Sequence, residues 1–328
     1  GCPAAGARRQ VYVCVKCTYQ SETALKSKET RSLSLSTTWG GKRHKMLIED
    51  LAAECLRHPE SSLAYYAPNG SIDRASLAEI GRAALALVKR LSAAGLQAGH
   101  VVGIQAENHP DWLVWDLATA KLNAVLRPYP SHHAFAPVER VAEHGLALLV
   151  SDQPAHAGQA HVAPLCPDGF KGTMVRREAA RSERADLHSI VYSSGTTGRE
   201  KVLMISRRGA ELALNLFIDV FHPNSADRHV VFLPFANYQQ RQQIYLALHC
   251  GVNLVVCGWP QAMRAIRRER ATFLLAPPAL YENMLSVAEE GGLSLTTLFG
   301  GEVRFLITGM AAIRPRVMWA YWDAGLKL

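Results

Sequence analysis

Hydrophobic and polar positions alternate along the chain with helical and strand spacings from about residue 47 onward. Apolar residues three or four positions apart mark one helix face: Leu77, Ile80, Ala84, Leu87, Val88 and Leu91. We expect this helix to follow an N-cap at Asp73 and to stop at Gly95. The apolar run at 101–105 predicts a buried strand, and Asn108 is expected to cap the next helix, with Pro110 in its first turn.

The same alternation continues through the rest of the chain. Further strands are expected at 124–126, 146–150, 189–192, 230–233, 253–257, 272–276 and 303–308. Further helices are expected at 137–144, 208–221, 239–250, 261–269 and 278–290. Because repeated strand–helix–strand units place parallel strands side by side beneath helices, we expect an α/β fold with largely parallel sheets. The last residues show an apolar strand pattern, and no closing helix is expected there.

Three regions are expected along the chain. Residues 1–46 form a basic arm that we expect to be disordered. Residues 154–184 interrupt the alternation with Gly, Pro and His and then with charged residues, which indicates a surface connection or an incomplete sheet element. We therefore expect a first α/β subdomain at 47–184 and a second at 185–328.

Charge is unevenly distributed along the 328 residues. The net charge is +8, of which residues 1–46, with nine Lys/Arg and two Glu, contribute +7. The remainder is close to neutral, which argues against a nucleic-acid-binding face on the folded part. The Ser/Thr-rich arm fits an organelle transit segment, a disordered tail or an unrelated upstream stretch. No apolar run approaches the roughly 20 residues that cross a bilayer, so we expect a soluble protein, and the scattered cysteines favour a cytoplasmic location.

The seven cysteines show no framework spacing, so reduced thiols are expected. Cys14 and Cys17 form a single C-x-x-C, and the nearest further ligands, Cys2 and His44, lie at no standard zinc spacing. No metal site is therefore predicted.

A loop rich in hydroxyls and glycine follows the strand at 189–192. It contains Ser193, Ser194, Gly195, Thr196, Thr197, Gly198 and Lys201. Hydroxyls and backbone N–H groups can surround phosphate oxygens, glycine permits close approach, and the lysine adds positive charge. The spacing is not that of the common P-loop, because Val202 follows Lys201 where that motif has Ser or Thr. The alternative is a turn that only links two elements. The loop follows the carboxyl end of a strand, where parallel sheets bind ligands.

This loop resembles the signature loop of the adenylate-forming enzymes, the superfamily of acyl-CoA synthetases, luciferases and peptide-synthetase adenylation domains. The similarity covers most of residues 47–328. The segments 233–241, 271–282, 298–301 and 304–309 are similar to the long-chain fatty acyl-CoA synthetase branch. The resemblance implies ATP-dependent activation of a fatty acid to an acyl-adenylate and then to an acyl-CoA thioester. ATP and coenzyme A would be co-substrates, and Mg²⁺ would bridge the phosphates.

Residue roles follow from the same resemblance. Phosphate donors would be Ser193, Ser194, Thr196 and Thr197, with Gly195 and Gly198 permitting the turn. Lys201 would neutralise the departing pyrophosphate, so Lys201 and Thr196 are the expected catalytic residues. Asn237 and Arg241 would line the acyl or ATP entrance, and Gly309 would lie near the acyl group. The alternatives are a solvated helix N-terminus for the first two and a plain strand end for Gly309.

The chain also departs from the family pattern. Replacements stand at Glu200, Val202, Asn237, Gln240 and Ala279. The chain ends at Leu328, before the family's Y-G-x-T-E segment and its C-terminal domain with the catalytic lysine. We therefore expect a truncated N-terminal part with weak or no turnover. The competing hypotheses are a non-catalytic nucleotide- or acyl-binding remnant or interaction protein, and a phosphotransferase.

One basic stretch has two interpretations. Its arginines are Arg264, Arg267, Arg268 and Arg270. They fit a solvated helix face, and the alternative is peripheral contact with acidic lipid headgroups.

Overall fold

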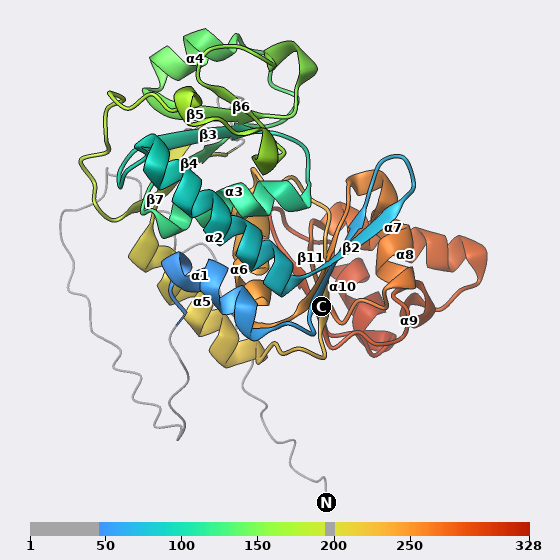
Figure 1. Cartoon of the computed structure of the whole chain (residues 1–328). Helices are drawn as coiled ribbons and strands as arrows, with labels where there is room; N and C mark the ends of the chain where they lie inside the picture. The colour runs from blue at the N-terminus through green and yellow to red at the C-terminus, as the bar shows by residue number, and fades with distance from the viewer. Residues whose placement is uncertain (1–45, 194–200) are drawn as a thin grey trace, which may run out of the picture. The chain divides into compact units, whose positions relative to one another are not determined.

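Two six-stranded sheets organise the residues that the computed structural model describes, 46–193 and 201–328 (Figure 1). Sheet I has the order β6-β5-β3-β4-β7-β8 and sheet II the order β12-β11-β9-β10-β1-β2. Sheet I consists of β3 (Val101–Gln105), β4 (Val125–Pro128), β5 (Leu146–Ser151), β6 (Val162–Pro164), β7 (Leu187–Ser193) and β8 (Lys201–Ser206). Sheet II consists of β1 (Ser62–Tyr66), β2 (Ile72–Ser76), β9 (Arg228–Val231), β10 (Asn253–Val256), β11 (Phe273–Ala276) and β12 (Phe305–Thr308).

Each sheet is parallel except at one edge, where β8 pairs antiparallel with β7 and β2 pairs antiparallel with β1. The predicted α/β class is confirmed. Four strands were not predicted, because none of them is part of a clear alternation of strands and helices: the hairpin strands β1, β2 and β8 and the short edge strand β6.

Ten α-helices connect and cover the strands in the described part of the chain. They are α1 (Leu51–Glu54), α2 (Leu77–Ala94), α3 (Pro110–Lys121), α4 (Pro137–Glu143), α5 (Arg207–Phe221), α6 (Tyr238–Cys250), α7 (Ala262–Arg268), α8 (Pro278–Gly291), α9 (Leu295–Leu298) and α10 (Pro315–Asp323). Helix α10 contradicts the expected strand pattern near the end of the chain, because Val317 and Tyr321 place one apolar face of a helix in the core. Within the described residues, none of these helices has the length and hydropathy of a membrane span.

Side-chain caps decide where two predicted helices begin. Ser76, not Asp73, caps α2: its side chain accepts a hydrogen bond from the Glu79 N–H, and the Glu79 carboxylate accepts one from the Ser76 N–H. His109, not Asn108, caps α3. Gly95 ends α2 as predicted, with a φ of 97° that favours glycine.

Each sheet contains strands from both sides of residue 185. The hairpin β7–β8 completes sheet I, whose other strands precede residue 185, and the hairpin β1–β2 joins sheet II, whose other strands follow it. The boundary expected at residue 185 therefore does not separate the two sheets. Local periodicity predicts strands, but long-range pairing decides which sheet each strand joins.

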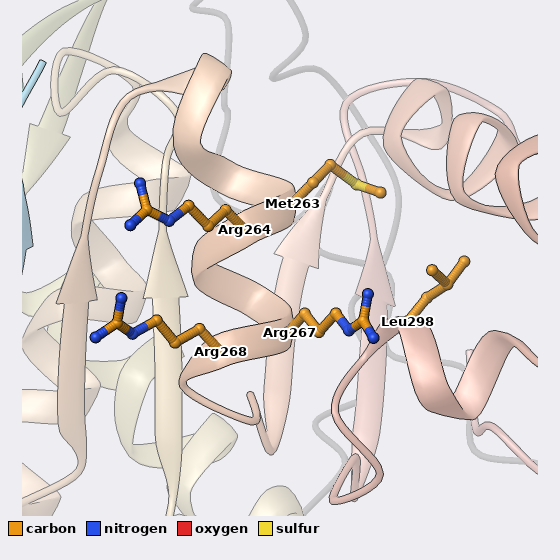
Figure 2. A pocket seen from close by; sticks show the side chains of 5 residues that line it. All are labelled: Met263, Arg264, Arg267, Arg268 and Leu298. Carbon is orange, nitrogen blue, oxygen red and sulfur yellow. The ribbon is translucent and has the colours of Figure 1, made fainter. Parts of the chain in front are cut away.

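Helix α7 covers part of sheet II with one face. Its buried side consists of Ala262, Ala265 and Ile266. Its exposed side carries three arginines, which Figure 2 shows together with Met263 and with Leu298 of α9: Arg264, Arg267 and Arg268. The predicted helix is confirmed, and its arginines face solvent.

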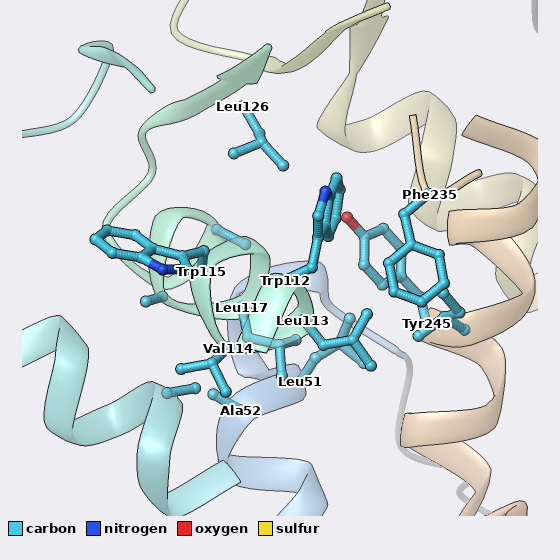
Figure 3. Packing of buried hydrophobic residues seen from close by; sticks show 14 of the residues in the cluster. Leu51, Ala52, Trp112, Leu113, Val114, Trp115, Leu117, Leu126, Phe235 and Tyr245 are labelled. Carbon is cyan, nitrogen blue, oxygen red and sulfur yellow. The ribbon is translucent and has the colours of Figure 1, made fainter. Parts of the chain in front are cut away.

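The main core lies around α3 and α6. Figure 3 shows the Trp112 ring of α3 near Phe235 and Tyr245, and the Trp112 and Phe235 rings meet edge to face at 5.4 Å. The Trp115 indole donates its N–H to the Leu165 carbonyl at 2.8 Å. Because these large rings are buried among apolar neighbours, they stabilise the packing of α3 and are core residues.

Candidate active site

The predicted phosphate loop is framed by two paired strands. Ser193 at the end of β7 and Lys201 at the start of β8 are register partners in the antiparallel hairpin. The predictions for Ser194, Gly195, Thr196, Thr197 and Gly198 lie outside the described residues. Lys201 is exposed. The ladder therefore holds both ends of the segment 194–200 together at one point of sheet I.

That point lies at the carboxyl edge of parallel strands. Strand β7 runs parallel to β4, with Leu126 opposite Ser189, and β4 runs parallel to β3. The carboxyl ends of these strands share one edge of the sheet, and such edges bind ligands in open α/β folds. Strand β7 therefore ends at the edge of sheet I where open α/β folds bind ligands.

A cationic and aromatic cluster adjoins the start of this loop. Arg127, on β4, donates from Nε and Nη2 to the Tyr192 hydroxyl at 3.0 and 2.8 Å. The Tyr129 hydroxyl lies 2.6 Å from His144 Nδ1. Burial, together with the charges of Arg127 and Arg140, lowers the pKa of His144 to about 4. The imidazole is therefore neutral at neutral pH, and Arg127 brings a positive charge to the side chain of Tyr192, two residues before the segment 194–200.

Two of the three predicted substrate-binding residues lie in neighbouring turns at the edge of sheet II. Asn237 caps α6 by accepting a hydrogen bond from the Gln239 N–H at 3.0 Å. Its Nδ2 lies 3.4 Å from the Met310 Sδ, one residue beyond Gly309. The start of α6 and the end of β12 therefore meet.

Unpaired polar atoms mark the same place. Gln239 Oε1 and Thr308 Oγ1 are buried and have no hydrogen-bond partner among the described residues. A Cβ built on Gly309 would lie 3.8 Å from Gln239 Oε1, so the two residues are neighbours. Met310 adopts a φ of 71°, which is uncommon for a residue other than glycine. A ligand is one explanation for a buried polar atom without a partner, and unusual backbone angles cluster at ligand sites.

Arg241 lies in the interior, not at an entrance, so that expectation is wrong. Its side chain is 0% exposed, and its Nε and Nη2 donate to the two Asp116 oxygens at 3.1 and 2.7 Å. Nη1 donates to the Ser189 hydroxyl at 2.9 Å, and Nη2 also donates to the Tyr245 hydroxyl at 2.6 Å. Burial alone would lower the pKa of Arg241, but Asp116 and Tyr245 hold it above its ordinary value. The charge of Arg241 is therefore used to join α3, α6 and β7.

Asn108 has a structural role that the sequence did not reveal. Its Nδ2 donates to the carbonyls of Leu233 and Cys257 at 2.9 and 3.1 Å. Its Oδ1 accepts from the Phe235 N–H at 2.9 Å. One amide thus ties the turn after β3 to the turns after β9 and β10. The available signal was a polar residue three positions after the end of a buried strand.

The described residues include no cluster of His, Cys, Asp and Glu that could hold a metal ion. We therefore assign none of these residues as a magnesium ligand. For nucleotide phosphates, the candidate groups that the structure describes are Lys201 and Arg127, which lie beside the two ends of the loop.

Comparison with known sequences decides the family. The sequence pattern of the AMP-binding enzyme family matches residues 51–327, most of the chain. The chain belongs to this family. The resemblance expected from the loop is thereby confirmed.

Individual relatives differ in kind. A 3-[(3aS,4S,7aS)-7a-methyl-1,5-dioxo-octahydro-1H-inden-4-yl]propanoyl:CoA ligase of Mycobacterium tuberculosis is 32% identical over 143 residues, which cover 42% of this chain and 27% of that protein. Tyrocidine synthase 1 of Brevibacillus parabrevis is 24% identical over 195 residues, 56% of this chain and 18% of that protein. The matches thus span about a quarter or less of these relatives' own lengths.

A solved structure shares the fold. The N-terminal subdomain of Klebsiella oxytoca NpsA, in complex with 3-hydroxybenzoyl-AMSN, aligns with a TM-score of 0.66 and 19% identity, covering 85% of this chain and 69% of that one. The two-sheet architecture is therefore that of an adenylate-forming N-terminal subdomain.

Proposed function

We propose that this chain provides the nucleotide-binding part of an enzyme that activates a carboxylate with ATP. The observation that supports the proposal is the match to the AMP-binding enzyme family, together with the pairing of Ser193 and Lys201 at the carboxyl edge of sheet I, on either side of the segment 194–200. In the proposed reaction a carboxylate oxygen attacks the α-phosphorus of ATP, the bond to pyrophosphate breaks, and an acyl-adenylate forms. Coenzyme A then displaces AMP to give a thioester.

The loop would hold the β- and γ-phosphates. Ser193, Ser194, Thr196 and Thr197 are the proposed hydroxyl donors, and Gly195 and Gly198 would let the backbone approach the oxygens. Lys201 would neutralise charge on the departing pyrophosphate. Mg²⁺ bound to the phosphates would supply further neutralisation.

Arg127 would add a second positive charge near the paired ends of the segment 194–200. Its guanidinium is bound to the Tyr192 hydroxyl, which fixes the charge beside the loop before nucleotide binds. Preorganised charge costs no reorganisation at the moment of reaction. Arg127 would therefore attract the polyphosphate electrostatically without needing to move.

The acyl group would bind where Asn237 and Gly309 meet. Gln239 Oε1 and Thr308 Oγ1 are buried there without partners among the described residues, which supports a ligand with polar atoms at this point. The segments similar to the long-chain branch favour a fatty acid. One relative is named for a fused-ring propanoyl group, and one structural neighbour is bound to 3-hydroxybenzoyl-AMSN. Cyclic and aromatic acids should therefore be tested beside fatty acids. Amino acids are tested as well, because the superfamily includes peptide-synthetase adenylation domains.

Carboxylate-dependent exchange of labelled pyrophosphate into ATP tests the reaction. Exchange with any of a fatty acid, an aromatic acid or an amino acid supports adenylation and names the substrate class. Nucleotide binding without exchange favours a non-catalytic remnant. Release of ADP would instead show a phosphotransferase.

A Lys201→Ala substitution tests the phosphate site directly. Because a hydrogen bond to a charged group contributes about 1.5–3 kcal/mol, ATP affinity should fall roughly ten- to hundredfold. Calorimetry measures the affinity, and Lys89→Ala, which removes an exposed lysine from α2, is the matched control. Equal affinities for both variants and the unmodified protein would remove the assigned role of Lys201.

A further inference from the structure

The exposed side of α7 carries charge that the proposed function does not use. Arg264, Arg267 and Arg268 line an open groove of about 560 Å³, together with Met263 and with Leu298 of α9 (Figure 2). We propose that this basic groove is a docking surface for a bilayer that contains anionic phospholipids. The proposal is independent of carboxylate activation.

The charge of the groove is not balanced by nearby carboxylates. Elsewhere at sheet II, Arg74 of β2 is paired with Glu269 at 2.8 Å. By contrast, no carboxylate in 46–193 or 201–328 lies within ion-pairing distance of the three groove arginines. Glu269 follows α7 directly, but it accepts from Arg74 and from the Tyr66 hydroxyl. Three uncompensated charges on one short helix attract an anionic partner.

The directions of the side chains favour a surface over a single anion. In Figure 2, Arg264 and Arg268 extend on one side of α7, and Arg267 extends on the other side, toward Leu298. Guanidinium groups that surround one phosphate converge on it, whereas these diverge. A leaflet of anionic lipids presents many separate headgroups, so each diverging arginine can find its own.

A second arginine-lined groove provides a contrast. It has a volume of about 470 Å³ and contains Arg90 and Arg177. Arg90 donates to the carbonyls of Pro167 and Phe170 at 2.9 and 2.5 Å, and Arg177 donates to the Ala94 carbonyl at 2.9 Å. Those guanidinium groups hold the chain together, whereas the groove arginines of α7 donate to no group of residues 46–193 or 201–328.

Apolar residues within the groove and in the turn before α7 suit the interface of a membrane. Trp259 lies in the 3-10 turn directly before α7 and is 47% exposed. Met263 is partly exposed within the groove. Tryptophan is enriched at the level of lipid headgroups, and arginine beside it pairs with anionic lipids. Because the apolar face of α7 is already buried against sheet II, the helix would lie on the membrane and not enter it.

Sedimentation of the full chain with vesicles tests the proposal. The vesicles contain phosphatidylcholine alone or with about 30 mol % phosphatidylserine. Binding is expected only to the anionic vesicles and should weaken as sodium chloride shortens the screening length. Each basic residue contributes roughly fivefold in partitioning, so Arg264→Gln/Arg267→Gln/Arg268→Gln should bind about a hundredfold more weakly. Circular dichroism checks that the triple variant is folded.

A second triple variant removes the same charge elsewhere: Arg82→Gln, Lys89→Gln and Arg208→Gln, all exposed. It should partition much as the unmodified protein does. Equal weakening of the two triple variants would show attraction by net charge or by residues 1–46, and would overturn the proposal. Equal binding to neutral vesicles would do the same.

A soluble competitor separates a bilayer from a phosphate ion. Inorganic phosphate should release the protein no better than sodium chloride of equal ionic strength. If phosphate releases it at low concentration, and heat of phosphate binding disappears only in the groove variant, the groove is a soluble phosphate site and the bilayer proposal is wrong.

Discussion

Removal of the Arg241 charge is the sharpest test of the internal network. In Arg241→Met the Asp116 carboxylate, 1% exposed, loses the guanidinium that binds both its oxygens. The Tyr245 hydroxyl, 2.8 Å from Asp116 Oδ2, is then left to solvate the charge. Breaking a buried ion pair by removing one partner costs about 3–5 kcal/mol. We expect the free energy of unfolding to fall by that amount.

A double variant separates the charge from the packing. In Arg241→Met/Asp116→Leu no buried carboxylate remains, and such apolar replacements of whole ion pairs are often close to neutral. The double variant should therefore be more stable than Arg241→Met, by about 2 kcal/mol or more. Urea unfolding, followed by tryptophan fluorescence and circular dichroism, measures all three free energies.

An exposed pair serves as the control for the same chemistry. Arg316 and Glu289 lie 2.8 Å apart with side chains 77% and 51% exposed, so Arg316→Met should leave stability unchanged within error. If Arg241→Met unfolds like the unmodified protein but loses affinity for nucleotide or carboxylate, Arg241 acts on a ligand and the reasoning from burial fails.

Two further predictions concern the titration of His229 and the space around Gly309. Burial, partly offset by the Phe273 carbonyl and Asp227, lowers the pKa of His229 to about 4. Because only the unfolded chain protonates this imidazole readily, the free energy of unfolding is highest above the unfolded pKa of about 6.5. It decreases as the pH falls toward 4, by about 2 kcal/mol at pH 5. Urea unfolding at several pH values should therefore show that acidification lowers the free energy of unfolding less in His229→Phe than in the unmodified protein. An equal pH dependence in the two proteins would contradict this assignment. A Cβ on Gly309 would lie 3.7 Å from Leu275 Cδ1, an ordinary contact, so Gly309→Ala should keep its melting temperature while pyrophosphate exchange falls roughly tenfold. Unchanged exchange would leave Gly309 as a plain strand end.

Element positions were largely predictable because periodicity is a local property. The strand predicted at 101–105 is β3 as observed, and Gly95 ends α2 as expected. Errors arose where one polar side chain decided a boundary. Ser76 and His109 cap their helices because their side chains reach free N–H groups, and neighbouring Asp73 and Asn108 looked equally suitable.

The sequence by itself determined the α/β class, most helices and strands, and the family. Each of these depends on residues that are neighbours along the chain. Only the tertiary structure decided that β1 and β2 join sheet II, that Asn108 clamps three turns, and that Arg241 is buried against Asp116. Asp116 and Arg241 are 125 positions apart, and a side chain's role depends on what folding brings to it and on whether water remains there. The spacing of apolar residues along the sequence reveals neither these distant contacts nor the exclusion of water.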